Sequence, residues 1–310
     1  MSIESKLQQT DDGSLSLLDA ETGELYHNRA GAYAEALNTY CLPSGILERL
    51  TKPIDAHADP NDIAHADLNV IAHAGAYDDI AVIDACFGLG YNTFVLLEQA
   101  ARQCDRTLRN QPTIKIMAFE TDAEVLEATE FVLRDERFPM MHDALRHSLP
   151  LTFGSYKFAC GKLNCELEIR QVDLRVAVPK QTGDFDVIFH DPFSPRKVPE
   201  LWTLDLFREY HRLLSARYGR LLTYSAAKAV RGAALAAGFT LFKTAAVGGK
   251  TGGTLAAVDH KLRAGSKVLN LSPEELKVVQ STSGTPYRDS GFTSAREDIL
   301  SRRQRELVSE

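Results

Sequence analysis

The sequence predicts a doubly wound α/β fold, in which helices cover both faces of a mostly parallel sheet. From about residue 80 onward, short apolar runs alternate with segments that carry apolar residues at helical spacing. The runs are rich in Val, Ile, Leu and Phe, as expected of strands that are buried on both faces. A chain of 310 residues is long enough for a large core and for at most two domains.

The predicted core occupies residues 76–260. The expected strands are Ile80–Asp84, Ile114–Phe119, Leu167–Val172, Val187–His190 and Leu221–Tyr224. The expected crossover helices are Asn92–Arg102, Asp122–Leu133, Thr203–Leu214 and Lys228–Ala237. Residues 151–170 alternate in β fashion around Gly161, so we expect a hairpin at about 151–166, inserted before the third core strand.

An N-terminal annex is expected at residues 1–75. Leu15–Tyr26 predicts two short strands around an Asp/Thr/Gly turn. A helix is expected from Gly31 to about Tyr40, and residues 51–75 are interpreted as an insertion.

A helical C-terminal tail is expected at residues 261–310. Ser272 and Ser294 each stand three residues before a glutamate, which is the spacing of a capping box at a helix start. Pro273 adds a proline at the first helical position of the earlier helix.

Composition excludes several classes of protein. The chain is 44% hydrophobic and 25% charged, has no apolar run near eighteen residues, and begins with a polar segment, so neither a membrane span nor a signal peptide is expected. Its five cysteines form no CxxC pair, which favours reduced thiols in the cytoplasm. The net charge of −7 conceals a division, because residues 1–195 hold 16 Lys and Arg against 31 Asp and Glu, whereas residues 196–310 hold 19 against 11. Random clustering with a basic tail would also give this division.

The segment Asp84 to Asn92 carries the strongest local motif, because it joins the first core strand to a helix. Gly88 and Gly90 allow a sharp turn and let a ligand lie against bare backbone at the helix start. A flavin or nicotinamide protein would have a third glycine where this chain has Thr93, so no flavin is expected.

Acidic residues end three of the core strands and suit a nucleoside ligand. Asp84 can receive an ammonium group, and Glu120 can hold two ribose hydroxyls. Together they favour S-adenosylmethionine, which combines an amino acid with a nucleoside and has no pyrophosphate. Asp173, at the end of the third strand, could bind the adenine amino group or simply begin a solvated turn.

The loop from Asp191 to Thr203 follows the fourth strand and contains three prolines, which make it stiff. If the acceptor is an amine, the Asp191 carboxylate could accept a hydrogen bond from its nitrogen and help to remove its proton, while Phe193 packs against the acceptor. The alternative is that Asp191 only caps a turn and that Trp202 belongs to the core. His190 points to the opposite face and is expected to pack.

Two further patterns are set aside. Gly248 to Thr254 contains the GK[ST] of a phosphate-binding loop, but Thr244 stands where that motif requires glycine, so a glycine-rich hairpin is favoured. Ala-His-Ala occurs three times, around His57, His65 and His73. A spacing of eight residues advances about 80° beyond two helical turns, so the imidazoles would not share a face and no metal is expected.

Five segments resemble the methyltransferase domain of the MnmC family. They are Phe87–Phe94 (FGLGYNTF), Glu120, Asp191–Thr203 (DPFSPRKVPELWT), Ala236–Lys243 (AAGFTLFK) and His27–Leu37 (HNRAGAYAEAL). The resemblance implies a Rossmann-like, S-adenosylmethionine-dependent enzyme that methylates 5-aminomethyl-uridine at the tRNA wobble position. Larger relatives carry an FAD-dependent oxidase, so the chain is similar to a stand-alone form. Ala85-Cys86 and residues 51–75 depart from the family pattern.

The resemblance also implies roles for individual residues. The cofactor-binding set comprises Asp84, Phe87, Gly88, Gly90, Asn92, Glu120, Asp173 and Asp191. The catalytic pair comprises Asp191 and Phe193. Substrate and RNA contacts are expected from Arg196, Lys197, Trp202, Lys250, Arg302, Arg303 and Arg305, whose cations would neutralise phosphates of an anticodon stem-loop.

Three functions therefore stay open. The first is N-methylation of tRNA, with a separate enzyme supplying the aminomethyl-uridine. The second is methylation of a small-molecule or protein amine, and the third is a non-catalytic S-adenosylmethionine-binding partner subunit. A polyamine synthase is disfavoured, because the loop after Asp191 is rich in proline and basic residues.

Overall fold

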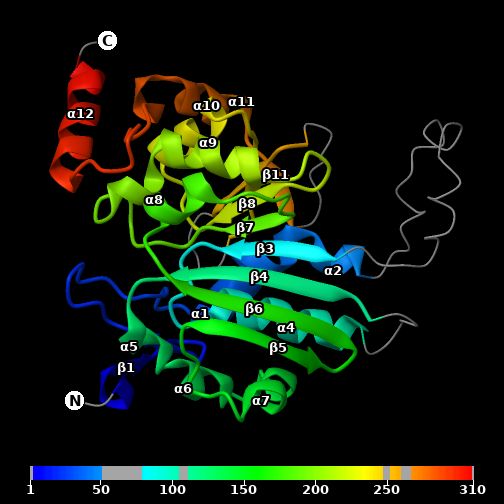
Figure 1. The fold of residues 1–310 in the computed structure, drawn as a ribbon. Coiled ribbons are helices and arrows are strands. Elements are labelled where there is room, and N and C mark those ends of the chain that lie inside the picture. The colour runs from blue at the N-terminus through cyan, green and yellow to red at the C-terminus, as the bar shows by residue number, and fades with distance from the viewer. Residues whose placement is uncertain (1–2, 51–78, 105–110, 247–251, 260–266, 309–310) are drawn as a thin grey trace, which may run out of the picture.

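The computed structural model describes residues 3–50, 79–104, 111–246, 252–259 and 267–308, and its centre is a nine-stranded sheet (Figure 1). The strand order is β11-β9-β10-β8-β7-β3-β4-β6-β5. The strands are β3 (Ile80–Asp84), β4 (Thr113–Glu120), β5 (Gly154–Cys160), β6 (Leu163–Gln171), β7 (Val187–Phe189), β8 (Arg220–Thr223), β9 (Thr240–Thr244), β10 (Thr254–Ala257) and β11 (Val268–Asn270). The five central strands, from β8 to β6, are parallel. At one edge, β5 runs antiparallel to β6. At the other edge, β10 runs antiparallel to β8 and β9, and β11 runs antiparallel to β9. The predicted Rossmann-like fold is confirmed.

Helices cover both faces of this sheet. The main ones are α4 (Tyr91–Cys104), α5 (Ala123–Leu126), α6 (Thr129–Leu133), α7 (Pro139–Leu145), α8 (Leu174–Ala177), α9 (Leu204–Leu213), α10 (Lys228–Ala236), α11 (Pro273–Gln280) and α12 (Arg296–Val308). Neighbouring residues of β3 illustrate the two layers, because Val82 belongs to the core cluster beneath α4 and Ile83 to the cluster beneath α9 and α10. A strand buried on both faces explains the continuous apolar runs in the sequence.

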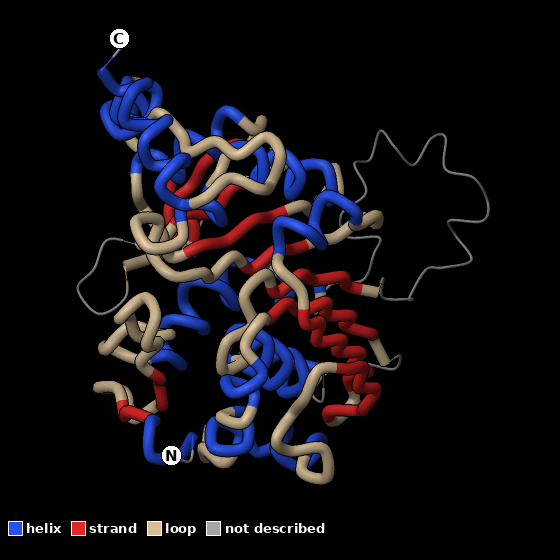
Figure 2. Tube along the Cα trace, turned by 60° about the vertical axis from the view of Figure 1, so that its left-hand side comes forward, coloured by secondary structure: helices blue, strands red, loops and turns tan. Residues whose placement is uncertain are grey.

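The N-terminal segment folds against the α4 side of the sheet. It comprises a 3-10 turn (Ile3–Lys6), β1 (Leu7–Gln9), β2 (Leu15–Leu17), α1 (Ala32–Glu35), a π-helix (Ala36–Cys41), a second 3-10 turn (Leu42–Ser44) and α2 (Ile46–Arg49). Its residues Ala36, Tyr40 and Ile46 are part of the same apolar cluster as α4. The segment therefore shares a core with the sheet, and Figure 2 shows its two short strands apart from the large sheet.

Two sequence expectations about hairpins are wrong in detail. In Leu15–Tyr26 only β2 forms a strand, and it pairs with β1. The expected turn is present, because Leu18 and Leu25 form one antiparallel bridge and the Asp19 side chain accepts from the backbone N–H and hydroxyl of Thr22. The hairpin around Gly161 does form, from β5 and β6. It is not an insertion before the third core strand, because its second arm is that strand, paired with β4 along its length.

Two helix expectations also need correction. The segment Asp122–Leu133 divides into α5 and α6, with Asp122 capping α5 through the Glu124 N–H. The capping box at Ser272 is present, but Ser294 does not start the last helix, because α12 begins at Arg296. The histidines of residues 51–75 and Lys250 lie outside the described residues.

The close packing of Gly232, in α10, against Gly284 of the C-terminal segment leads to a prediction about stability. A Cβ at this position would lie 1.8 Å from the Gly284 carbonyl oxygen. Alanine favours a helix interior over glycine by about 1 kcal/mol, but overpacking costs about 1–3 kcal/mol. Gly232→Ala is therefore expected to lower the melting temperature, measured by thermal denaturation, whereas Ala236→Ser on the exposed side of α10 should leave it nearly unchanged. A higher melting temperature for Gly232→Ala would contradict the close approach.

Candidate active site

A cavity of about 1030 Å³ lies at the edge of the sheet where the parallel strands end. Its wall combines residues 19–35 of the N-terminal segment with residues that follow β3, β4, β6, β7 and β8, and with Arg296 and Glu297 of α12. Parallel strands present their carboxyl ends at one edge, and ligands bind where the strand order reverses, here between β3 and β7. The N-terminal segment thus closes one side of the cavity.

The glycine loop after β3 forms one part of the wall. Gly88 and Gly90 have φ values of 53° and 86°, a region that glycine adopts without strain. A Cβ on Gly90 would meet the Phe94 ring at 2.5 Å, so no other residue fits there without displacing that ring. Gly88 lines the cavity, whereas Phe87 is buried beneath the loop.

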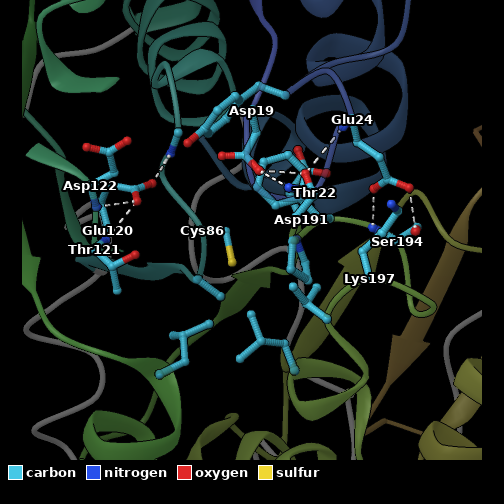
Figure 3. Close-up of a pocket in the computed structure, with 18 of the residues that line it drawn as sticks. Asp19, Thr22, Glu24, Cys86, Glu120, Thr121, Asp122, Asp191, Ser194 and Lys197 are labelled. Atoms are coloured by element: carbon cyan, nitrogen blue, oxygen red, sulfur yellow. Dashed lines mark hydrogen bonds between the residues drawn. The ribbon is translucent and has the colours of Figure 1, made fainter. Parts of the chain in front are cut away.

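Glu120, at the end of β4, is held by three backbone N–H groups. Its Oε2 accepts from Gly88 at 2.9 Å, and its Oε1 accepts from Thr121 at 2.7 Å and Asp122 at 3.0 Å (Figure 3). Burial raises the pKa of this carboxyl, and the three donors oppose that shift. The carboxylate is consequently fixed at the cavity wall, on the other side of Cys86 from Asp191 (Figure 3).

Asp84 lies beneath the loop, not on the cavity wall that the structure describes. It is fully buried, and its Oδ2 accepts from the Thr93 hydroxyl at 2.7 Å. Its Oδ1 has no hydrogen-bond partner, and burial raises its pKa to about 8. Thr93, which replaces the third glycine of a dinucleotide motif, therefore supports the acid at the strand end. Sequence reasoning missed that role.

Asp191 follows β7 and lines the cavity. Its Oδ2 accepts from Asn92 Nδ2 at 2.8 Å, so the structure brings together two residues that the sequence places 99 positions apart. Burial raises the pKa of Asp191 to about 6, although the hydrogen bond from Asn92 favours the ionised form.

The three residues after Asp191 are each held by a different part of the chain. The Pro192 carbonyl accepts from the Tyr224 hydroxyl at 3.0 Å, and the Phe193 carbonyl accepts from Trp202 Nε1 at 2.9 Å. Glu24 accepts from the Ser194 backbone N–H at 2.8 Å and from its hydroxyl at 2.6 Å (Figure 3). We call residues 191–194 the acceptor loop.

Aromatic rings fix the acceptor loop from both sides. The Phe193 ring lies in the cavity wall, 5.0 Å from the ring of Tyr26 in an edge-to-face arrangement. Trp202 is fully buried, 4.7 Å from the His190 ring and 5.8 Å from the Tyr224 ring. The expected substrate contact of Trp202 is therefore corrected, because its indole supports the loop from inside. The expected packing role of His190 is confirmed, since its ring is fully buried.

Asp173 begins a turn, as one of the two sequence interpretations expected, and also lines the cavity. It caps α8 by accepting from the Arg175 N–H at 2.8 Å, and it pairs with the Arg175 guanidinium at 3.0 Å. It also lines the cavity, between the apolar side chains of Val172 and Leu174. The turn and the site are therefore the same feature.

The predicted RNA-contacting residues divide between the cavity and α12. Lys197 lines the cavity, and Arg196 is exposed beside it. Arg302 and Arg303 donate to the backbone carbonyls of Arg288 and Thr285, so they anchor α12 and are only part-exposed, whereas Arg305 is exposed.

Several other residues line the wall and were missed by sequence reasoning. They gave no signal because they come from several segments that are distant in the sequence: Asp19, Glu24, Tyr26, Glu35, Asp122, Arg175, Glu200, Tyr224 and Arg296. Cys86 also lines the wall, and it lies within the Asp84–Asn92 motif without having been assigned to the site. Carboxylates outnumber basic groups along this wall, so the cavity suits a positively charged ligand. In the described part of the chain, no group of three or more His, Cys, Asp or Glu side chains could hold a metal ion, and no helix is long and apolar enough to span a membrane.

Comparisons with known proteins agree with this geometry. Residues 136–259 match a family model described as S-adenosyl-L-methionine-dependent methyltransferase. An uncharacterised protein of Methanocaldococcus jannaschii is 26% identical over 96% of this chain and 71% of its own length. The bifunctional tRNA 5-methylaminomethyl-2-thiouridine biosynthesis protein MnmC of Aromatoleum aromaticum is 26% identical over 79% of this chain, which spans about a third (34%) of that relative.

A solved structure shares the fold. The crystal structure of MnmC2 from Aquifex aeolicus superposes with a TM-score of 0.71 at 23% identity, over 98% of this chain and 84% of its own. The match at residues 136–259 and the shared fold support an S-adenosylmethionine-dependent methyltransferase domain. The chain is similar to part of the MnmC relatives.

The hydrogen bonds between Glu24 and Ser194 predict that the N-terminal segment limits the motion of the acceptor loop. Hydrogen bonds to a charged group contribute about 1.5–3 kcal/mol, so Glu24→Gln should weaken the contact and speed amide exchange at residues 192–198 by about tenfold or more. Hydrogen-exchange mass spectrometry measures this directly. Glu21→Gln, an exposed change in the same loop, is the matched control. Equal exchange in the two variants would show that Glu24 does not hold the loop.

Proposed function

We propose that this protein is an N-methyltransferase that converts the 5-aminomethyl group of wobble uridine in tRNA to 5-methylaminomethyl. The observation that carries the proposal is the Asp191 carboxylate, which lines an acidic cavity on the side opposite Glu120. A carboxylate in that position suits an amine acceptor, and the MnmC relatives carry tRNA 5-methylaminomethyl-2-thiouridine biosynthesis in their names. The described residues include features that fit S-adenosylmethionine and features that fit an amine on tRNA.

The cavity suits S-adenosylmethionine. Its glycine loop leaves room that a Cβ would fill, since a Cβ on Gly88 would meet the Tyr26 ring at 3.1 Å. We assign Glu120 to the ribose hydroxyls, Asp173 to the adenine amino group, and Gly88 with Gly90 to the methionine part. The sequence assigned Asn92 and Asp84 to direct contact with S-adenosylmethionine. We now assign them supporting roles, because Asn92 donates to Asp191 and Asp84 accepts from Thr93 beneath the glycine loop.

The bound methyl donor supplies an electrophilic methyl group, and the chain supplies the orientation and the proton acceptor. An alkyl amine is mostly protonated near neutral pH and must lose a proton before it can attack. Asp191 accepts a hydrogen bond from the amine nitrogen, directs its lone pair toward the methyl group, and passes its proton to water. Phe193 forms the neighbouring wall and limits the positions that the amine adopts.

RNA binding is assigned to the basic groups near the cavity mouth and on α12. Arg196, Lys197 and Arg305 would neutralise phosphates, and Lys250 keeps the same expectation from sequence. The chain spans about a third of the bifunctional MnmC relatives. The reaction needs aminomethyl-uridine as its substrate, and we propose that a separate enzyme supplies it. We place the reaction in the cytoplasm, in keeping with five cysteines that form no disulfide.

The decisive assay mixes the protein with labelled S-adenosylmethionine and tRNA that carries 5-aminomethyl-uridine. Nucleoside digestion and mass spectrometry should reveal labelled 5-methylaminomethyl-uridine. Asp191→Asn should lower the rate by about 100-fold or more, because general-base and orienting contributions are of that order. Asp143→Asn, the same change at an exposed site on α7, is the control.

Two results of this assay would favour a different function. Transfer to a small or protein amine, with little dependence on salt, would assign the enzyme to that acceptor class, since phosphate contacts make RNA binding strongly salt-dependent. Binding of S-adenosylmethionine with no transfer to any acceptor would indicate a partner subunit.

The rate of methyl transfer is expected to depend on pH through the ionisation of Asp191. Its pKa of about 6 means that the carboxylate is ionised and able to accept a proton above pH 6, and is protonated below it. The single-turnover rate with saturating substrates should therefore fall about tenfold per pH unit below pH 6, in addition to the dependence that the amine itself imposes. Rapid-quench measurements from pH 5 to pH 8 test this. No additional loss below pH 6 would show that Asp191 does not act as the proton acceptor.

A further inference from the structure

Arg175 lies on the cavity wall and holds the carboxylate of its neighbour Asp173. It is the second residue of α8, which Asp173 caps. Its Nη2 lies 3.0 Å from Oδ2 of Asp173, and its Nε lies within 3.4 Å of both carboxylate oxygens. The donors of a guanidinium are fixed in one plane, so contacts from two of them orient the carboxylate. The Asp173 side chain stays 39% exposed, so its oxygens can still accept from a ligand.

The third nitrogen of the same guanidinium reaches the C-terminal part of the chain. Nη1 donates to the Ser294 carbonyl, 119 positions later in the sequence, at 3.3 Å. It also lies 3.9 Å from Oδ2 of Asp289, a fully buried carboxylate oxygen that has no hydrogen-bond partner among the described residues. The Arg175 cation therefore compensates part of the buried charge of Asp289.

Residues 287–297, which we call the strap, connect the core to the first turn of α12. The strap is attached to the start of α9, because the Tyr287 carbonyl accepts from the Leu204 N–H at 2.9 Å. At its other end, Arg296 and Glu297 line the cavity. Figure 1 shows α12, in red, on the same side of the molecule as α8. The strap is therefore part of the wall of the candidate site.

Asp289 also determines the shape of the strap. Its Oδ1 accepts from the N–H groups of Thr293 and Ser294 at 3.2 and 3.1 Å, and its carbonyl accepts from the Phe292 N–H at 3.0 Å. Phe292 has a φ of 54°, a conformation that a residue with a side chain keeps only where its surroundings hold it. These contacts hold the turn that presents the Ser294 carbonyl to Arg175.

We propose that Arg175 is a positioning residue that couples the strap to the adenine end of the cavity, because one guanidinium holds both Asp173 and the strap. The inference rests on the proposed function, in which Asp173 accepts from the adenine amino group. A ligand that fixes Asp173 and a strap that fixes Arg175 then stabilise each other, and this coupling is reciprocal. Docking of the strap raises the affinity for S-adenosylmethionine, and the bound ligand holds the strap in place.

The first test measures binding of S-adenosylhomocysteine, which needs no methyl acceptor. Arg175→Lys keeps the positive charge but replaces the planar set of donors by one ammonium group, which cannot hold both partners. Isothermal titration calorimetry should show about tenfold weaker binding, since a hydrogen bond to a charged group is lost or misplaced. Equal affinity of Arg175→Lys and the unaltered protein would overturn the inference.

Arg212→Lys is the matched control. Arg212 also pairs with a carboxylate, that of Glu209 at 2.7 Å, and also donates to a backbone carbonyl, that of Gln181 at 3.1 Å. It is not one of the residues that line the cavity. Its lysine variant should bind S-adenosylhomocysteine within twofold of the unaltered protein, and a tenfold loss in this variant as well would overturn a specific role of Arg175.

A ligand without the adenine amino group separates positioning of Asp173 from a general effect on the site. In the analogue of S-adenosylhomocysteine whose base is unsubstituted purine, no base N–H is available for Asp173. Arg175→Lys should therefore weaken binding of this analogue by less than twofold. A tenfold loss for both ligands would contradict the inference, because Arg175 would then support the cavity as a whole.

Hydrogen-exchange mass spectrometry follows the strap itself. S-adenosylhomocysteine should slow amide exchange at residues 289–297 of the unaltered protein by about tenfold, the same factor as in binding, because the coupling is reciprocal. This protection should be lost in Arg175→Lys and in Asp289→Asn, which removes the buried charge that faces Arg175. Exchange in the strap that does not respond to the ligand in the unaltered protein would overturn the coupling.

These measurements also separate the inference from the proposed function. A protein that binds S-adenosylhomocysteine with the expected dependence on Arg175, but transfers no methyl group to tRNA, supports the inference and refutes the proposed acceptor. A protein that methylates tRNA, and whose Arg175→Lys variant binds S-adenosylhomocysteine as tightly as the unaltered chain, supports the proposed function and overturns the inference.

Discussion

A carboxylate that is withdrawn from water, yet must be ionised to work, is the constraint on which the candidate site depends. Asp191 sits at the end of the central strand β7 in surroundings that raise its pKa, so its charged form requires donors from the protein. Asn92 supplies one of them through its side-chain amide. The remaining contacts of the acceptor loop keep the backbone of Asp191 where this donor reaches its carboxylate.

That arrangement explains why the N-terminal segment is part of the site. The Tyr40 ring packs against Phe189 at the end of β7, Glu24 holds Ser194, and the Tyr26 ring packs against Phe193. These side chains come from residues outside the sheet, and they complete a cavity whose other walls are the ends of parallel strands. A sheet edge alone would place Glu120 and Asp191, but it would leave the acceptor loop open to water on one side.

The sequence predicts those parts of the molecule that depend on local patterns. Apolar runs located the central strands, and the glycine motif with Glu120 and Asp191 located the cavity, because their positions follow from strand ends in a parallel sheet. It could not predict Tyr40, Glu24 or Tyr26, since their roles arise from packing between distant segments. Trp202 was misplaced for the same reason: a tryptophan in a polar loop gives no sign of which side its indole faces.

The structure shows where acidic and basic residues from the two parts of the chain lie relative to the cavity. Eight of the acidic residues in 1–195 line the wall, where they favour a cationic amine, whereas Lys197 of the C-terminal part lines the cavity and Arg302, Arg303 and Arg305 lie on α12. Some of those arginines anchor α12 to the preceding loop, so only part of the positive charge is available to a nucleic acid.

The central claim is that Asp191 contacts the accepting amine while Asn92 holds its carboxylate. A crystal structure with S-adenosylhomocysteine and an anticodon stem-loop that carries 5-aminomethyl-uridine tests it most directly. We predict that the amine nitrogen lies within hydrogen-bonding distance of the Asp191 carboxylate, with the Asn92 donor still in place. An amine bound elsewhere in the cavity, or an Asp191 side chain turned away from it, would contradict the account.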